Sequence, residues 1–192
     1  MNFEERNFNL YDLFVTVICW FIAVALVMYV IKPVEAVFND NVAVVSYLFL
    51  PHGIRIIAAM AYGPLNAFIY LFVAHLVSMV TLQEAYADTT TMVLQATICA
   101  AVGPVAIALI GQTFGKASVS LETVSASTWR VMFFAALLAS LFSSVFQPLA
   151  LGTYLSLGEA LSTSITYLVG DVLGAFAMFA ILTLALRSVL RP

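Results

Sequence analysis

Long apolar runs, separated by short polar or glycine- and proline-containing stretches, follow one another along nearly the whole chain. A hydrocarbon core about 30 Å thick is crossed by about 20 helical residues, and the runs have this length. Charged residues, Lys32-Pro33 and Gly63-Pro64 bound them. The pattern predicts an all-α integral membrane protein of about six transmembrane helices. These are expected at residues 13–31, 42–62, 65–82, 92–110, 131–151 and 165–186.

The second run differs from the others because Pro51-His52-Gly53 and Arg55 lie at its centre. Proline removes a helical hydrogen bond and glycine weakens the same turn, so this helix is expected to be broken at Pro51–Gly53, near mid-depth. His52 and Arg55 are three residues apart and share a face that points toward the break. Broken helices at the membrane midplane often line binding sites.

Composition supports the membrane interpretation. Hydrophobic residues make up 64% of the chain and charged residues only 9%, against roughly 25% charged in an average soluble domain. The mean hydropathy is +1.08. The 192 residues form one transmembrane domain with no room for a soluble module. The lipid bilayer is thus the first expected partner, and nothing in the composition indicates binding to nucleic acid.

The distribution of basic residues predicts the orientation. With six spans, the two ends and the second and fourth connections lie on one side and hold five basic residues: Arg6, Lys116, Arg130, Arg187 and Arg191. The other side holds only Lys32. By the positive-inside rule both termini are expected in the cytoplasm.

Ionisable and amide side chains within the spans are the candidate site, since a charge at membrane depth costs about 2.5–3.5 kcal/mol and needs a partner or a wet cavity. The rise per residue places Asp171 within reach of His52 and Arg55. The six candidates are His52, Arg55, His75, Gln95, Gln147 and Asp171. Three interpretations stay open: a structural ion pair, a site for a small ligand or ion, and a proton path.

Other chemistry has weaker support in the sequence. A haem held by His52 and His75 is conceivable because both lie near mid-depth, but two histidines on successive helices are a weak signal. Cys19 and Cys99 lie at different depths, so we expect neither a disulfide nor a metal site. No nucleophile with its base, no pair of catalytic carboxylates and no phosphate loop is evident, so an enzyme is not expected.

Two short motifs resemble those of a bacterial family. Leu50-Pro51-His52-Gly53-Ile54, followed by Ala58-Ala59 and Gly63, and the later stretch Gly170-Asp171-Val172-Leu173-Gly174 resemble motifs of the membrane-associated sensor domains of the first type. In other proteins these domains precede histidine kinases and diguanylate cyclases. The resemblance implies a sensor-like helical module in which Pro51, Gly53, Asp171 and Gly174 mark a helix crossing. The chain is shorter than the usual eight-helix domain, and no output domain follows Pro192.

Two alternatives accompany the sensor-like interpretation. The length and span number are similar to those of the substrate-binding subunits of energy-coupling-factor transporters, although the first span offers only Ala23 and Ala25 toward their alanine motif. Gly170 and Gly174 also form a small-xxx-small face on which a helix can approach closely. That face favours a structural accessory subunit of a larger membrane complex. Another membrane protein, a second copy of the chain and a small ligand are therefore the expected partners.

Overall fold

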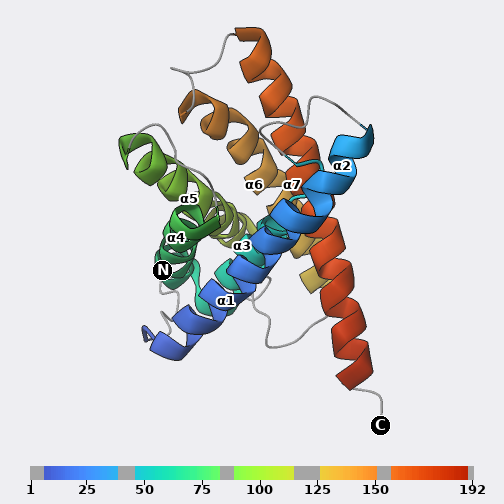
Figure 1. Cartoon of the computed structure of the whole chain (residues 1–192). Helices are drawn as coiled ribbons and strands as arrows, with labels where there is room; N and C mark the ends of the chain where they lie inside the picture. The colour runs from blue at the N-terminus through green and yellow to red at the C-terminus, as the bar shows by residue number, and fades with distance from the viewer. Residues whose placement is uncertain (1–6, 39–45, 83–88, 115–125, 151–156, 190–192) are drawn as a thin grey trace.

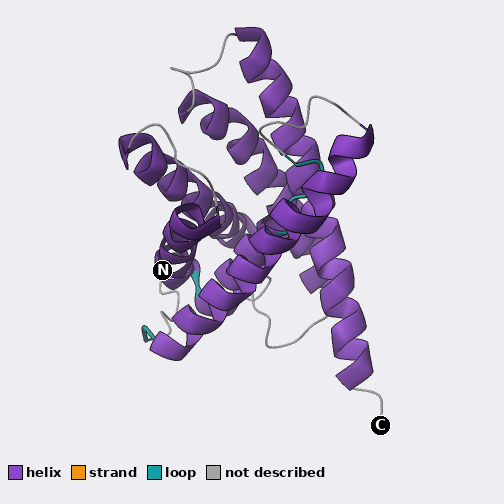
Figure 2. Cartoon of the chain, viewed as in Figure 1, coloured by secondary structure: helices purple, strands orange, loops and turns teal. Residues whose placement is uncertain are grey.

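The computed structural model describes residues 7–38, 46–82, 89–114, 126–150 and 157–189, which are almost entirely helical (Figures 1 and 2). The elements in chain order are α1 (Leu10–Leu26), η1 (Val27–Ile31), α2 (Lys32–Phe38), α3 (Pro51–Tyr62), α4 (Pro64–Leu82), α5 (Thr89–Phe114), α6 (Ala126–Ala150) and α7 (Leu157–Val189). Because α1, η1 and α2 are continuous, the described residues contain six helices, as the hydrophobic pattern predicted.

Five of these helices are long and apolar enough to cross a membrane. Their candidate spans are Leu10–Val37, Pro64–Leu82, Thr89–Thr113, Thr128–Ala150 and Gly158–Ala185. Each contains most of one predicted span and extends beyond it by three or more residues at one end or both, except the second, which begins one residue early and ends as predicted. The protein is therefore a multi-pass helical membrane protein, in contact with the lipid bilayer.

The prediction that Lys32-Pro33 ends the first span is wrong, because the helix continues to Phe38. Residues Val27–Ile31 form a wider, π-helical turn, in which the N–H of Lys32 donates to the carbonyl of Val27. Pro33 has no N–H to donate, so the ladder of helical hydrogen bonds must be interrupted here in any case. A π-turn just before the proline lets the chain continue as a helix.

The second predicted span contains a helix only in its second half. Among its described residues, Ser46–Leu50 are not helical, and α3 begins at Pro51. Residues 42–45 of that prediction lie outside the described residues. The predicted break at Pro51–Gly53 is thus the start of a helix rather than a kink within one. Proline suits the first turn of a helix, where no N–H is needed.

The half-helix α3 occupies the centre of the bundle and contacts α1, α4, α5, α6 and α7. In Figure 1, α1 crosses in front of it and α7 runs along one side. The consecutive helices α4, α5, α6 and α7 each pack against the next, and α1 packs against α4. Alanine is frequent in the core, as at Ala67, Ala106, Ala139 and Ala175. Small residues of this kind let membrane helices approach closely.

Contacts at the two ends of α1–α2 fix the direction of the segment that contains α3. Ser46 donates a hydrogen bond to Glu35 of α2 at 3.0 Å. At the opposite end, the N–H of Asn9 donates to the hydroxyl of Tyr70 at 2.9 Å, and the Tyr70 ring packs edge-on against Tyr62. Residues 46–62 therefore run antiparallel to the first helix, from its Glu35 end to its Asn9 end.

Candidate functional site

The N-terminal end of α3 is held against α7 by backbone contacts. The N–H of Phe49 donates to the carbonyl of Gly170 at 3.0 Å. A methyl group added at Gly170 would overlap the carbonyl oxygen of Ser46, and one added at Gly174 would overlap that of Phe49. Both glycines are thus needed for the segment Ser46–Leu50 to lie directly on α7. The small-xxx-small face predicted from the sequence is covered by the protein's own chain.

Gly53 allows the same close contact between α3 and α7, here from the side of α3. A methyl group there would crowd the side chain of Met178 and the Cα atom of Ala175, both in α7. The first turn of α3 therefore lies close to α7 along its whole length. This close approach brings the side chains of His52 and Arg55 within reach of Asp171.

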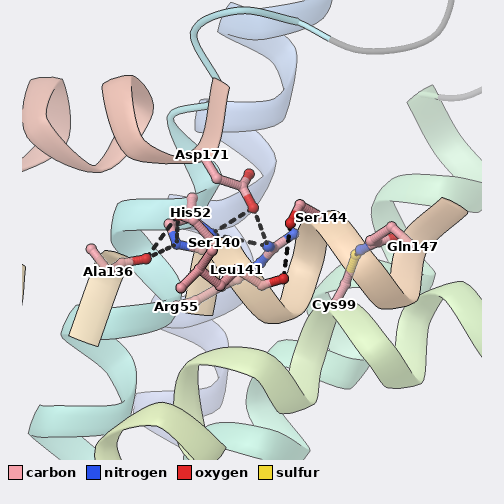
Figure 3. Close-up of polar contacts among 9 residues, drawn as sticks. All are labelled: His52, Arg55, Cys99, Ala136, Ser140, Leu141, Ser144, Gln147 and Asp171. Carbon is pink, nitrogen blue, oxygen red and sulfur yellow. Dashed lines mark hydrogen bonds and ion pairs between the residues drawn. The ribbon is translucent and has the colours of Figure 1, made fainter. Parts of the chain in front are cut away.

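Three ionisable side chains meet at this junction (Figure 3). Nδ1 of His52 lies 3.1 Å from Oδ2 of Asp171, and Nη1 of Arg55 lies 3.7 Å from the same oxygen. Nη1 of Arg55 is also 3.2 Å from Nδ1 of His52. The side chains are 0–1% exposed. We refer to His52, Arg55, Asp171 and the hydroxyl of Ser140, described next, as the central polar cluster.

The other ring nitrogen of His52 faces α6. Nε2 lies 3.2 Å from the carbonyl oxygen of Ala136 and 3.1 Å from the hydroxyl oxygen of Ser140. Ser140 itself donates to the carbonyl of Ala136 at 2.7 Å. Both ring nitrogens of His52 thus contact protein atoms, and the imidazole bridges α6 and α7.

Arg55 is enclosed by aromatic rings as well as by the carboxylate. Its guanidinium carbon lies 5.4 Å from the ring centre of Trp20 in α1 and 5.3 Å from that of Phe49. A cation over a ring face is stabilised by the negative face of the π system. On its backbone side, Arg55 packs against Gly103 of α5, where a methyl group would approach its carbonyl oxygen to 3.0 Å.

Several buried polar atoms of this region have no hydrogen-bond partner among the described residues: Nε of Arg55, both carboxylate oxygens of Asp171 and the hydroxyl of Ser143 in α6. The charge of Arg55, 3.7 Å from Oδ2, attracts the carboxylate of Asp171, and Nδ1 of His52 and the hydroxyl of Ser143 lie beside it. Buried polar atoms without partners cost about 1–3 kcal/mol each. The cluster therefore keeps an unused capacity for hydrogen bonds.

The two predicted glutamines form a neighbouring pair between α5 and α6. Nε2 of Gln95 donates to the backbone carbonyl of Gln147 at 3.1 Å, and the amide of Gln147 contacts the sulfur of Cys99. In Figure 3, Gln147 and Cys99 lie at one end of the group of side chains, and His52 lies at the other. Gln95 thus reaches the backbone of Gln147, and the side chain of Gln147 reaches Cys99, so both contacts join α5 to α6.

His75 belongs to a separate contact between α1 and α4. Its ring packs edge-on against Trp20, with 5.4 Å between ring centres, and Trp20 donates from Nε1 to Ser78 at 3.1 Å. Neither ring nitrogen of His75 has a hydrogen-bond partner among the described residues. A haem held by His52 and His75 does not fit this arrangement, because both nitrogens of His52 contact protein atoms.

The cluster brings one carboxylate, one guanidinium and one imidazole into contact. Asp171 lies beside the first turn of α3, where the helix dipole is positive and favours an anion. Arg55 supplies the balancing cation, and His52 touches both groups. Since the attraction between opposite charges is strong away from water, the contact between α3 and α7 depends on the charge state of these three side chains.

Sequence reasoning missed four participants in this region: Ser140, Ser143, Trp20 and the backbone carbonyl of Ala136. Ser140 and Ser143 are three residues apart in α6 and share a face with Ser144, a periodic polar signal that could have identified them. Trp20 was not considered because a tryptophan in an apolar span has many ordinary roles. The carbonyl of Ala136 carries no signal in the sequence, since every residue has one.

The chain was compared with known protein families, with curated proteins and with solved structures, and none of them matches it.

Proposed function

We propose that this protein is a non-enzymatic membrane module of sensor-like architecture that binds a small polar ligand at the central polar cluster. The observation that carries the proposal is the burial of three ionisable side chains where a half-helix meets α7. Packing alone does not require them, since buried ion pairs are often replaced by apolar residues without loss of stability.

The unused hydrogen-bonding capacity of the cluster supports a ligand. Oδ1 of Asp171 and Nε of Arg55 offer an acceptor and a donor, both buried and unpartnered among the described residues. A small molecule or ion with complementary groups would meet both. Because the side chains are 0–1% exposed, binding of anything larger than a proton or a water molecule requires α3 to move relative to α7.

The resemblance to sensor domains points to how such a movement would be used. Of the positions that carry the resemblance, Gly53, Asp171 and Gly174 lie where α7 meets residues 49–53, and Pro51 begins α3. A change at the cluster would therefore alter the helix crossing that the two motifs form. In this proposal the altered crossing is passed to another membrane protein or to a second copy of the chain.

A bacterial inner-membrane location with both termini in the cytoplasm is part of the proposal. The orientation rests on the excess of basic residues at the two ends and in the second and fourth connections of the predicted topology. The course of residues 46–62 supports an even number of crossings. The segment begins beside Glu35 at one end of the first helix and ends beside Tyr70 at the other, so it runs opposite to that helix.

A substrate-capture subunit or small transporter is the second candidate, and the half-helix favours it. Transporters place interrupted helices at their substrate sites, where the freed backbone groups and the helix dipole contact the substrate. The accessory-subunit alternative loses its main support, because segment Ser46–Leu50 of the same chain covers the Gly170/Gly174 face.

Native mass spectrometry of the full chain in mild detergent tests the proposal. We expect the wild-type protein to carry a small adduct that Asp171→Asn loses. Asp12→Asn, which removes a carboxylate from the first turn of α1, should keep the adduct. Size-exclusion chromatography checks that each variant is folded. Ligand binding would be contradicted if the wild-type protein has the mass of the bare polypeptide, both from detergent and from lipid nanodiscs.

A further inference from the structure

The hydrogen bonds around His52 define which of its nitrogens carries a proton. The carbonyl oxygen of Ala136 can only accept, so its contact with Nε2 at 3.2 Å requires a proton on Nε2. Ser140 uses its own hydrogen on the same carbonyl, so its oxygen can also accept from Nε2. On the other side of the ring, Nη1 of Arg55 can only donate, so its contact with Nδ1 at 3.2 Å requires a lone pair there.

The neutral imidazole protonated on Nε2 satisfies all these contacts, but it leaves Asp171 unsatisfied. Oδ2 lies 3.1 Å from Nδ1, which in this tautomer has no hydrogen to donate to the carboxylate. Two lone pairs thus face each other in a buried site. The arrangement offers room for one proton between a basic nitrogen and a carboxylate oxygen.

We infer that the central polar cluster is a proton-binding site, in which one proton is shared between Nδ1 of His52 and Oδ2 of Asp171. This inference rests on the proposed function and adds proton binding to the chemistry of the same site. Without the proton, Arg55 and Asp171 balance and the cluster has no net charge. With the proton, the imidazole donates to Asp171, the hydrogen bond from Arg55 to Nδ1 is lost and the cluster carries one positive charge.

Few other titratable side chains of the described helices around α3 lie near this proton. Besides Arg55 and Asp171, the titratable side chains near the cluster are His75 of α4 and Cys99 of α5, both close enough to Arg55 to feel its charge. From α6 come only the hydroxyls of Ser140 and Ser143, and from α1 the ring of Trp20. Asp171 is thus the acid group that faces the imidazole, and Arg55 is the opposing cation.

Backbone contacts around Asp171 link protonation of the cluster to the position of the segment that leads into α3. Asp171 follows Gly170, whose carbonyl accepts from Phe49, and it precedes Gly174, which touches Phe49 directly. Phe49 also lies against the guanidinium of Arg55. When the proton breaks the contact between Arg55 and His52, the guanidinium and the Phe49 ring must readjust together. Proton uptake is therefore coupled to the position of the segment that leads into α3.

Nitrogen NMR of the ring nitrogens tests the inference directly, because the chain has only two histidines. The full protein, labelled with ¹⁵N-histidine in lipid nanodiscs, is titrated between about pH 8 and about pH 4. His75→Gln assigns the signals of His52, and His52→Gln assigns those of His75. We expect Nε2 of His52 to stay protonated throughout, and Nδ1 to move from the unprotonated to the protonated range.

Asp171→Asn provides the second arm. An amide cannot share the proton as a carboxylate does, so the Nδ1 signal should stay unprotonated down to a lower pH than in the wild type. If this variant does not fold, the wild-type titration still decides. A wild-type Nδ1 signal that stays unprotonated across the range in the folded protein, or a proton on Nδ1 instead of Nε2 at high pH, would overturn the inference.

The NMR titration and the mass-spectrometry experiment test separate claims. A titrating Nδ1 without a mass adduct would keep the proton site and remove the small-molecule ligand. An adduct with an Nδ1 that does not titrate would keep ligand binding and remove the proton.

Discussion

At the scale of single residues, Asp171 is the side chain on which the most contacts depend. It pairs with two groups of α3 and sits between the glycines that admit the backbone of Ser46–Leu50. A carboxylate in a bilayer is costly unless its charge is compensated. Here the compensation comes from Arg55, from the His52 contact and from the positive end of the α3 dipole.

Replacing Asp171 by asparagine should lower the free energy of unfolding by about 3–5 kcal/mol, because it leaves Arg55 as a buried charge without a counter-ion. The double variant Arg55→Met/Asp171→Asn removes both charges and should recover much of that loss. Unfolding in mixed micelles, titrated with a denaturing detergent, measures both. A double variant whose loss equals the sum of the single losses would show that the two charges do not interact.

The sequence predicted this pairing because the depths of His52, Arg55 and Asp171 agree when helical rise is counted from the membrane boundary. It also placed Gln95, Gln147 and His75 in one site with them. The structure assigns the glutamines to an α5–α6 contact and His75 to an α1–α4 contact. Depth is readable from a sequence, whereas the direction in which a side chain points around its helix depends on packing.

At the scale of elements, the distinctive feature is a half-helix that starts inside the bundle. The five long spans follow from apolar runs of sufficient length, which is why they could be predicted. Pro51 was interpreted as a kink, although proline at a first helical position is the commoner arrangement. The course of Ser46–Leu50 could not be predicted, because those residues are held by the backbone of Gly170 on a helix more than a hundred residues away.

Gly174→Ala should destabilise the protein by about 1–3 kcal/mol or more, since the new methyl group overlaps the backbone of Phe49. Gly158→Ala is the matched control in the same helix, because a methyl group there meets no atom within 4 Å. Alanine is the better helix former, so the control should be neutral or slightly stabilising. Thermal unfolding in detergent compares the two. Equal stability of both variants would mean that α3 is not seated against α7.

At the scale of the whole molecule, the segment Ser46–Tyr62 decides how many times the chain crosses the membrane. It begins beside Glu35 and ends near Tyr70, so it runs alongside nearly the whole first helix in the opposite direction. The bent segment Ser46–Leu50 and the half-helix α3 together connect the two ends of the first helix. In Figure 1, α1 starts and α7 ends toward the same side of the bundle.

Both ends of the chain are therefore expected in the cytoplasm. A reporter enzyme that works only in the cytoplasm should be active when it is fused to either end. Six crossings return the chain to its starting side, and the basic residues select the cytoplasmic one. A second reporter enzyme, which works only outside the cytoplasm, should be inactive when it is fused to either end. Termini on opposite sides would mean that residues 46–62 enter and leave the membrane on the same side.

The seat of α3 on α7 also has a consequence for the order in which the protein is made. Asp171 leaves the ribosome 116 residues after Arg55 (171 − 55). At about 5–20 residues per second, Arg55 waits on the order of 6 to 23 s for its counter-ion. A twelve-residue helix with a charge cannot settle alone in lipid, so α3 completes its insertion only after synthesis has reached α7. The last helix to take its final place in the membrane is therefore α3, from the first half of the sequence, and not α7.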